Sequence, residues 1–163
     1  MKQNPCNHPT LIPVIPNVDN MKCVQLFSRQ ADCRDEKGPL YRIVRESLNL
    51  SNDMDIVDLF ESEYLHKRDK IASLQRLLLQ AADEGDIYAM DAYAQAAKEL
   101  YDIVCGVKKQ IFKEKDCMVS CSGGIFKTGD VIRKPFVKLL EANGMKLTES
   151  KAEPSHSVPF APR

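Results

Sequence analysis

Two adjacent glycines follow a short apolar run in the stretch VSCSGGIFKTGD, residues 119–130. Glycines at the end of a strand can form a tight turn, or they can let a ligand approach the backbone because they lack a Cβ atom. If a helix follows, its N-terminus adds hydrogen-bond donors and positive potential for an anionic group. The residues alone leave both interpretations open, a ligand cradle and a simple turn.

Two catalytic motifs resemble this stretch, and both are incomplete. Lys127 and Thr128 match the end of a P-loop, but that motif requires glycine immediately before the lysine, where Phe126 stands. A nucleophile elbow would use Ser122, yet Ser120 occupies the position of its first glycine. The chain has three histidines for a triad, His8, His66 and His156, of which the first and last lie in expected tails. We therefore assign no catalytic residue.

The six cysteines do not indicate a metal site. Cys117 and Cys121 share a face of an expected strand, where residues four apart lie about 13 Å from each other, too far to bind one metal ion. Cys6 and His8 have no second pair of ligands nearby. We therefore expect no metal site, and we interpret Cys105, Cys117 and Cys121 as apolar packing residues.

The composition is that of one domain of ordinary size. The 163 residues include 23 Lys+Arg and 23 Asp+Glu, so the formal net charge is zero, and we expect no nucleic-acid partner. No apolar run reaches the length of a membrane helix, and the N-terminus lacks the apolar region of a signal peptide. These features predict a cytoplasmic protein without a membrane partner.

The first half of the chain is predicted to be mostly helical. Residues 1–22 contain four prolines, which predict an extended or disordered lead-in. Cys23–Phe27 is expected to be a short strand. Pro39 suits the first turn of a helix, and further helices are expected after a cap at Asn52 or Asp53 and from Asp69 onward.

The second half is predicted to be a helix followed by a β-α-β unit. Gly85 and Asp86 are expected to end one helix and cap the next, in which an apolar stripe repeats at helical spacing. That stripe comprises Ile87, Met90, Ala94, Ala97, Tyr101, Val104 and Ile111, interrupted by Lys108. A strand over 117–121, buried on both faces, and one over 145–148 should pair in parallel. The helix between them ends at Asn143-Gly144, and Pro135 either kinks it or starts a new helix.

The residues 119–140, VSCSGGIFKTGDVIRKPFVKLL, resemble the second adenosine-binding segment of the sugar-kinase, heat-shock-ATPase and actin superfamily. They are most similar to ATPases of the N-acetylglucosamine kinase and benzoyl-CoA-reductase-activator type. In that family a helix that follows a Gly-Asp break, as in AADEGDIYAMDAYAQAAKEL at 81–100, leads into such a strand. RQADCRDEKGPLYRIVRESLNL, residues 29–50, fits more weakly. The resemblance covers roughly residues 25–154.

The resemblance implies an α/β fold, a helix-rich fragment of an actin-like (ribonuclease H-like) C-terminal subdomain over residues 23–153, followed by a tail over 154–163. It implies that Ser122, Gly123 and Gly124 bind the adenosine of ATP, with Lys127 over the ribose or adenine. The Asp-x-Gly-x-Thr motif, the phosphate loop and the catalytic acid of the family are absent from the sequence. We therefore expect Mg²⁺ and an amino-sugar acceptor to bind only to a complete member of the family.

Two functions follow from these features. One is the nucleoside-binding half of an ATP-dependent sugar kinase, inactive alone, which would associate with an N-terminal half or with itself. The other is a non-catalytic helical interaction protein that retains the ATPase scaffold. Phosphoryl transfer requires metal, base and phosphate clamp together, which explains the expected inactivity.

Overall fold

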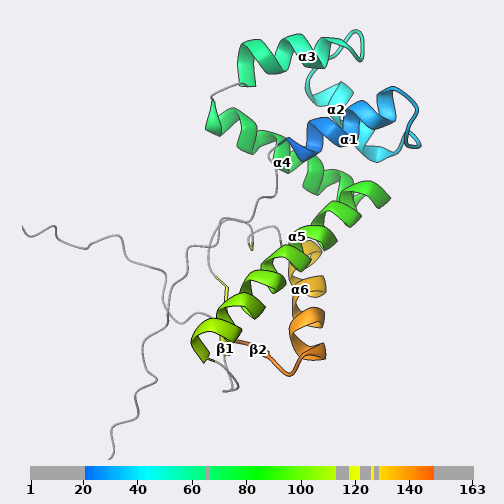
Figure 1. Ribbon diagram of the computed structural model, residues 1–163. Coiled ribbons are helices and arrows are strands. Elements are labelled where there is room, and N and C mark those ends of the chain that lie inside the picture. The colour runs from blue at the N-terminus through cyan, green and yellow to red at the C-terminus, as the bar shows by residue number, and fades with distance from the viewer. Residues whose placement is uncertain (1–20, 65–66, 113–117, 122–125, 127–128, 149–163) are drawn as a thin grey trace, which may run out of the picture.

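The computed structural model describes residues 21–64, 67–112, 118–121, 126 and 129–148. Helices α1 to α4 form a group at one end of the molecule, and a β-α-β unit lies at the other end (Figure 1). The long helix α5 (Ile87–Val107) runs from one to the other and packs against α6 (Asp130–Ala142) as well as α4 (Arg68–Asp83). The architecture is a helix-rich α/β arrangement with a small parallel sheet.

The first element of the helical group is a helix, where the sequence predicted a strand. Residues 23–27, expected to be a strand, lie inside α1 (Lys22–Ala31). The buried side chains of α1 are Cys23, Leu26, Phe27 and Gln30, which repeat at helical spacing. A segment of five residues is too short to distinguish a strand from a helix by its periodicity, and the longer pattern that extends to Gln30 follows the helical spacing. The expected lead-in lies outside the described residues except for Met21 and Lys22, where α1 begins.

The remaining helices of this group largely match their expected positions. Helix α2 (Pro39–Ser47) starts at the predicted proline. Helix α3 (Asp55–Leu59) continues into the π-helical turn η1 (Phe60–Tyr64), and α4 follows. The prediction that Asn52 or Asp53 caps α3 was wrong, because the helix begins after Met54 and neither side chain caps it. The Asn52 side chain instead accepts a hydrogen bond from the Met54 backbone N–H.

Helix α5 begins where the sequence predicted, but its buried face differs from the predicted stripe. Gly85 has φ +85°, and the Asp86 side chain caps the helix. Ile87 and Met90 are 64% and 51% exposed. The buried residues are Ala89, Ala92, Tyr93, Ala96, Ala97 and Leu100. The small alanine side chains on this face let α6 and α4 approach α5 closely. Helix α5 therefore buries the side that allows close packing, and not the side that carries Ile87 and Met90.

The β-α-β unit is confirmed as a parallel pair. Strand β1 (Met118–Ser120) pairs with β2 (Lys146–Thr148), with Met118 opposite Lys146 and Ser120 opposite Thr148. α6 connects them as one helix with Pro135 inside it, and Gly144 follows with φ +67°. The prediction that both faces of the strand are buried was wrong, because Met118 is 80% exposed and Ser120 is exposed, whereas Val119 and Cys121 pack against the core.

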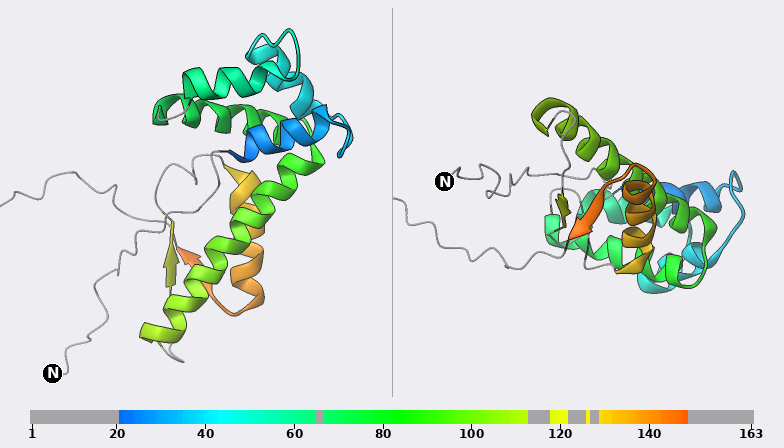
Figure 2. Two further views of the ribbon diagram at one scale, coloured as in Figure 1. Left: turned by 45° about the horizontal axis from the view of Figure 1, so that its top comes forward. Right: turned by 90° about the horizontal axis from the view of Figure 1, so that it is seen from below.

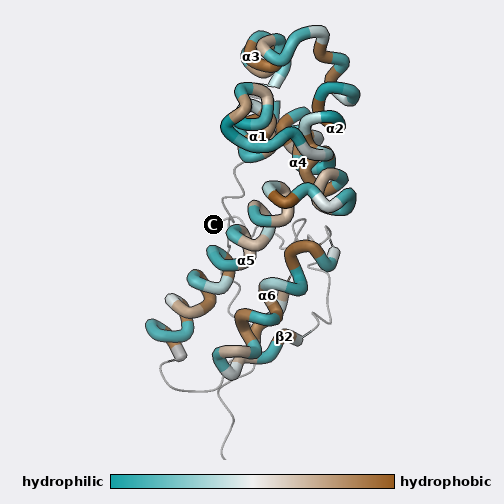
Figure 3. The backbone as a smooth tube through the Cα atoms, turned by 90° about the vertical axis from the view of Figure 1, so that its right-hand side faces the viewer, coloured by the Kyte–Doolittle hydropathy of each residue, from teal (hydrophilic) through white to brown (hydrophobic). Residues whose placement is uncertain are grey.

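The left view of Figure 2 shows the same division, with α1 to α4 away from the two strands. Hydrophobic and hydrophilic stretches alternate along α5 and α6, as expected for helices with one buried side (Figure 3). No helix among the described residues is long and apolar enough to cross a membrane.

Asp86 ties the beginning of α5 to the helical group. Its carboxylate is 1% exposed and accepts hydrogen bonds from the backbone N–H groups of Tyr88 and Ala89 in α5, at 3.1 and 3.0 Å. It also accepts one from the Leu40 N–H in the first turn of α2, at 2.9 Å, and one from the Gln30 side chain at 3.4 Å. One buried side chain therefore caps two helices and contacts a third.

Candidate functional site

The predicted ligand-binding residues lie outside the part of the chain that the structure describes. This applies to Ser122, Gly123, Gly124 and Lys127. Their described neighbours are the end of β1 on one side and Phe126 and Gly129 on the other. Because β1 and β2 are parallel and α6 connects them, the carboxyl end of β1 lies where α6 begins.

Among the described residues, no side chain caps the N-terminus of α6. Gly129 occupies the cap position with φ +76°, a conformation that favours glycine. Its backbone N–H donates to the Phe126 carbonyl at 3.4 Å. The Asp130 carboxylate pairs with Lys134 at 2.9 Å, and both side chains are largely exposed. An α-helix leaves its first N–H groups without intrahelical partners, so this end has donors available to an acceptor.

An aromatic contact fixes Phe126 at this end of the sheet. The rings of Phe126 and Phe136 are 5.9 Å apart, tilted by 48°. Phe136 is 2% exposed and belongs to the core, whereas Phe126 is half-buried. Such a tilted aromatic pair adds to the stability that burial gives. The half-buried ring leaves apolar surface beside the end of β1.

Cys121 lies at the same end of the sheet and is not an activated nucleophile. Burial raises the pKa of its thiol to about 11, while the positive charge of Arg133 opposes the shift. A thiol with this pKa is protonated near neutral pH, and only the thiolate is a good nucleophile. The half-buried side chain also packs against the core. Cys121 is therefore a packing residue, as the sequence predicted.

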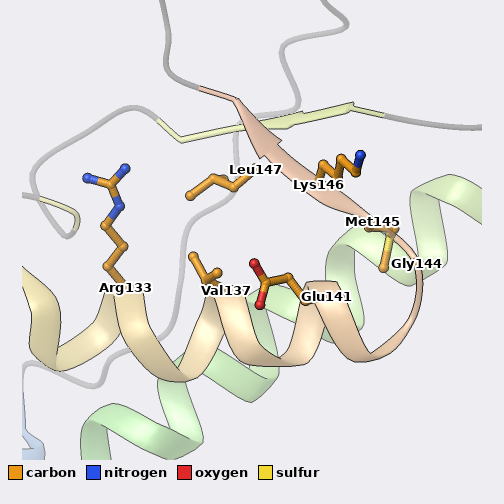
Figure 4. A pocket seen from close by; sticks show the side chains of 7 residues that line it. All are labelled: Arg133, Val137, Glu141, Gly144, Met145, Lys146 and Leu147. Carbon is orange, nitrogen blue, oxygen red and sulfur yellow. The ribbon is translucent and has the colours of Figure 1, made fainter.

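A groove runs along α6 from this end of the sheet. We call it the α6–β2 groove; it encloses about 640 Å³. Arg133, Val137 and Glu141 line it from α6, and residues 144–147 line it from the turn and β2. Figure 4 shows the three α6 side chains rising from one side of the helix toward β2, with Arg133 at one end and Glu141 at the other.

The groove has a charged rim and an apolar centre. Arg133, Glu141 and Lys146 are exposed, whereas Val137 and Leu147 are half-buried and Met145 is buried. Sequence reasoning missed the three α6 residues of the groove because it followed the apolar residues of this helix, Val131, Ile132, Phe136, Leu139 and Leu140, of which Ile132, Phe136 and Leu140 are buried. The groove residues of α6 follow these buried residues by one position each. A search for a second stripe with the same spacing would have found them.

The described residues beside the end of β1 include groups that could contact a ligand, but no metal site. The N-terminus of α6 and the Arg133 side chain carry positive potential, which favours an anionic group, and the half-buried Phe126 ring presents apolar surface. Within the described ranges no group of three His, Cys, Asp or Glu side chains is placed to hold a metal ion. A scan of protein-family models gives no match for the chain, and a search among curated proteins gives no significant match.

Proposed function

We propose that this chain is the nucleoside-binding part of an ATP-dependent sugar kinase, similar to N-acetylglucosamine kinases and of actin-like fold. The observation that supports it most is the parallel β1-α6-β2 unit, in which the carboxyl end of β1 lies beside a helix N-terminus that no described side chain caps. Ligands of α/β proteins bind in the crevice outside the carboxyl ends of parallel strands. The resemblance places the adenosine of ATP there, against Ser122, Gly123 and Gly124, with Lys127 beside it.

The chain supplies the nucleoside side of this proposal alone. The sequence lacks the family's Asp-x-Gly-x-Thr motif, which would bind Mg²⁺ and phosphate. Adenosine, ADP and ATP should therefore bind with similar, low affinity, because most polar contacts to the phosphates are lost. We also expect no transfer of phosphate to N-acetylglucosamine. A coupled ADP-release assay that shows sugar-dependent turnover by the purified chain would contradict this part.

Nucleotide titration tests the binding site. Adenosine, ADP and ATP are titrated into ¹⁵N-labelled protein, and the shift changes should cluster at Ser120, Cys121 and Gly129. Gly124→Val should abolish these changes, because a β-branched side chain would occupy the space of the ligand. Gly106→Ala is the matched control, since a methyl group added at Gly106 meets no atom within 4 Å. Chemical-shift changes in other parts of the protein, or nucleotide binding by Gly124→Val as tight as by the parent, would mean that the two glycines form only a turn.

A specific observation favours the second function, a non-catalytic helical interaction protein. Large apolar side chains are exposed: Ile87 and Met90 on α5 are 64% and 51% exposed, and Met54, in the turn before α3, is 70% exposed. Exposed apolar groups that gather on one surface are typical of protein interfaces. Both proposed functions include association of the chain with an N-terminal half or with a second copy. The absence of any nucleotide-dependent shift in the titration would favour the interaction function.

A further inference from the structure

The apolar side of α5 continues beyond the part of the helix that is buried. Leu100 is the last buried residue of the helix, and Ile103, Val107 and Ile111 follow it on the same side at intervals of three and four residues. Ile103 and Val107 are only half-buried, and Ile111 is 56% exposed in the π-helical turn η2 (Lys108–Phe112). This end of the helix therefore presents apolar surface that the described part of the chain covers only in part.

Two lysines lie beside this apolar surface. Lys108 is half-buried and Lys109 is exposed. The sequence has no acidic residue between 103 and 112, and neither lysine forms an ion pair with a described residue. We call residues 107–111 the basic end of α5. It combines exposed apolar groups with positive charges that no described carboxylate neutralises.

Helix α3 and the turn η1 carry a surface of the opposite charge. Met54 and Val57 are 70% and 47% exposed, and Asp58 and Glu61 are exposed as well. These four residues occupy positions i, i+3, i+4 and i+7, so they lie along one side of the helical segment. Neither Asp58 nor Glu61 forms an ion pair with a described residue. We call these four residues the acidic face of α3.

The acidic face of α3 and the basic end of α5 lie at opposite ends of the molecule. Helix α3 belongs to the helical group, whereas α5 ends beside the two strands (Figures 1 and 2). The two surfaces therefore do not cover each other within one chain, but they can meet between two copies. Contact of either surface with the same surface of a second copy is disfavoured, because like charges would face each other.

Charge also distinguishes a second copy from the terminal segments of the same chain. Residues 1–20 and residues 149–163 each contain as many acidic as basic side chains, so neither segment offers a net charge to the basic end. The acidic face of α3 offers two carboxylates beside two apolar side chains. Of the surfaces that this chain provides, the acidic face is the one whose chemistry matches the basic end.

We propose that the acidic face of α3 in one copy of this chain docks on the basic end of α5 in another copy. The two apolar residues of the acidic face cover Val107 and Ile111, and its two carboxylates pair with Lys108 and Lys109. Because each copy carries both surfaces, the contact is heterologous and repeats head to tail, into a ring or an open chain. The contact specifies how the proposed association with a second copy occurs, and it does not depend on nucleotide binding.

Two charge-removing variants test the contact. One is Asp58→Asn with Glu61→Gln, the acidic-face variant, and the other is Lys108→Gln with Lys109→Gln, the basic-end variant. A fluorescently labelled chain is titrated with unlabelled chain at low salt, and binding is measured by anisotropy. The parent should bind itself, and each variant should bind itself roughly tenfold more weakly, because the charge pairs are lost.

A mixture of the two variants should restore binding. The acidic-face variant retains its basic end, and the basic-end variant retains its acidic face, so one intact contact remains between them. The mixture should form a 1:1 complex about as tight as the parental contact, and raising the salt concentration should weaken it. Adding Ile111→Gln to the acidic-face variant should weaken this complex roughly threefold at unchanged charge, because apolar contact is lost.

The matched control is Asp91→Asn with Glu99→Gln, two exposed positions of α5 that change the net charge as the acidic-face variant does. It should bind itself like the parent, and circular dichroism should show that all variants are folded. Parental self-binding by either test variant, or a mixture that binds no more tightly than each variant alone, would overturn the head-to-tail contact. Self-binding that appears only after removal of residues 149–163 would assign the basic end to the chain's own tail. Neither result would alter the nucleotide titration, so failure of this contact and failure of nucleotide binding are distinguishable.

Discussion

The Asp86 carboxylate accepts a hydrogen bond from the backbone of Leu40, 46 positions earlier in the chain, as well as from its own helix. The sequence predicts only half of this arrangement. An aspartate before a periodic apolar segment indicates a helix cap. The second helix that shares the same cap could not be predicted, because the contact depends on how α2 and α5 meet in space.

Loss of this carboxylate should destabilise the fold substantially. Asp86→Ala leaves buried N–H groups of two helices without an acceptor, and we expect a loss of about 2–4 kcal/mol in the free energy of unfolding. Gly38→Ala should also destabilise, because the added methyl group would lie 2.6 Å from an Asp86 carboxylate oxygen. In the double variant the clash is absent, so the two losses should not add.

Urea denaturation of the parent protein, the two single variants and the double variant measures how strongly the effects of Asp86→Ala and Gly38→Ala depend on each other. Asp130→Ala is the matched control at another helix N-terminus. Its side chain is 70% exposed, and an exposed ion pair contributes about 0.2–1 kcal/mol. Additive losses for Asp86→Ala and Gly38→Ala would mean that the glycine is required for a reason other than its distance from this carboxylate.

The buried thiol of Cys23 should make stability fall at alkaline pH. Burial raises its pKa from 9.0 to about 12, and the side chain is 2% exposed. Above pH 9 the unfolded chain loses this proton while the folded chain keeps it, so stability is full below pH 9 and is lost progressively as pH rises to about 12. At pH 10 the loss should be about 1.4 kcal/mol.

Cys23→Val removes this group while preserving an apolar side chain. Urea midpoints at pH 8 and pH 10 should differ less in Cys23→Val than in the parent. Burial also raises the pKa of Tyr93 to about 12, so part of the alkaline loss should remain in the variant. An unchanged pH dependence in Cys23→Val would show that the thiol does not titrate differently in the folded and unfolded chains.

Among the helices, α6 is the one whose sequence conflicts most with its structure. Pro135 has no N–H to donate to the Val131 carbonyl, yet the helix continues through it from Asp130 to Ala142. Ile132, Phe136 and Leu140 are buried on both sides of the proline, and this packing holds the helix together. The apolar spacing therefore predicted the helix correctly, while the choice between a kink and a break needed the tertiary contacts.

Pro135→Ala should stabilise the protein, because it restores a donor and removes a ring that strains the preceding turn. We expect the free energy of unfolding to rise by about 1–3 kcal/mol, measured by urea denaturation. Lys134→Ala, at the exposed neighbouring position, should change it by less than about 0.5 kcal/mol. A loss of stability in Pro135→Ala would show that contacts of the half-buried ring outweigh its cost to the helix.

The faces of helices were harder to predict than their existence. For α5 the sequence predicted a stripe through Ile87 and Met90, and both are exposed. Either set of apolar residues fits the helical period, and the choice depended on which one α4 and α6 could approach. The candidate ligand cradle stays a prediction, because its residues lie outside the described part. The α6–β2 groove required the structure, since α6 and β2 form it together.

Across the protein, exposed apolar side chains predict self-association. Ile87 and Met90 lie one turn apart on α5 and are both more than half exposed. Ile87→Gln with Met90→Gln should lower the sedimentation coefficient at high protein concentration in analytical ultracentrifugation, and leave the thermal melt unchanged. Asp91→Gln, an exposed position of the same helix, is the control and should sediment like the parent. Concentration-independent sedimentation of the parent protein would contradict self-association.

Helix α5 has a mechanical consequence, because it begins at the Asp86 contact and reaches the β-α-β unit. Its 21 residues span about 31 Å, so a tilt of roughly 5° at its first turn displaces its far end by about 3 Å. Helix α6 packs along α5 and would be carried with it. A small change in the angle between α2 and α5 at their shared cap would therefore be enlarged at the distant α6–β2 groove.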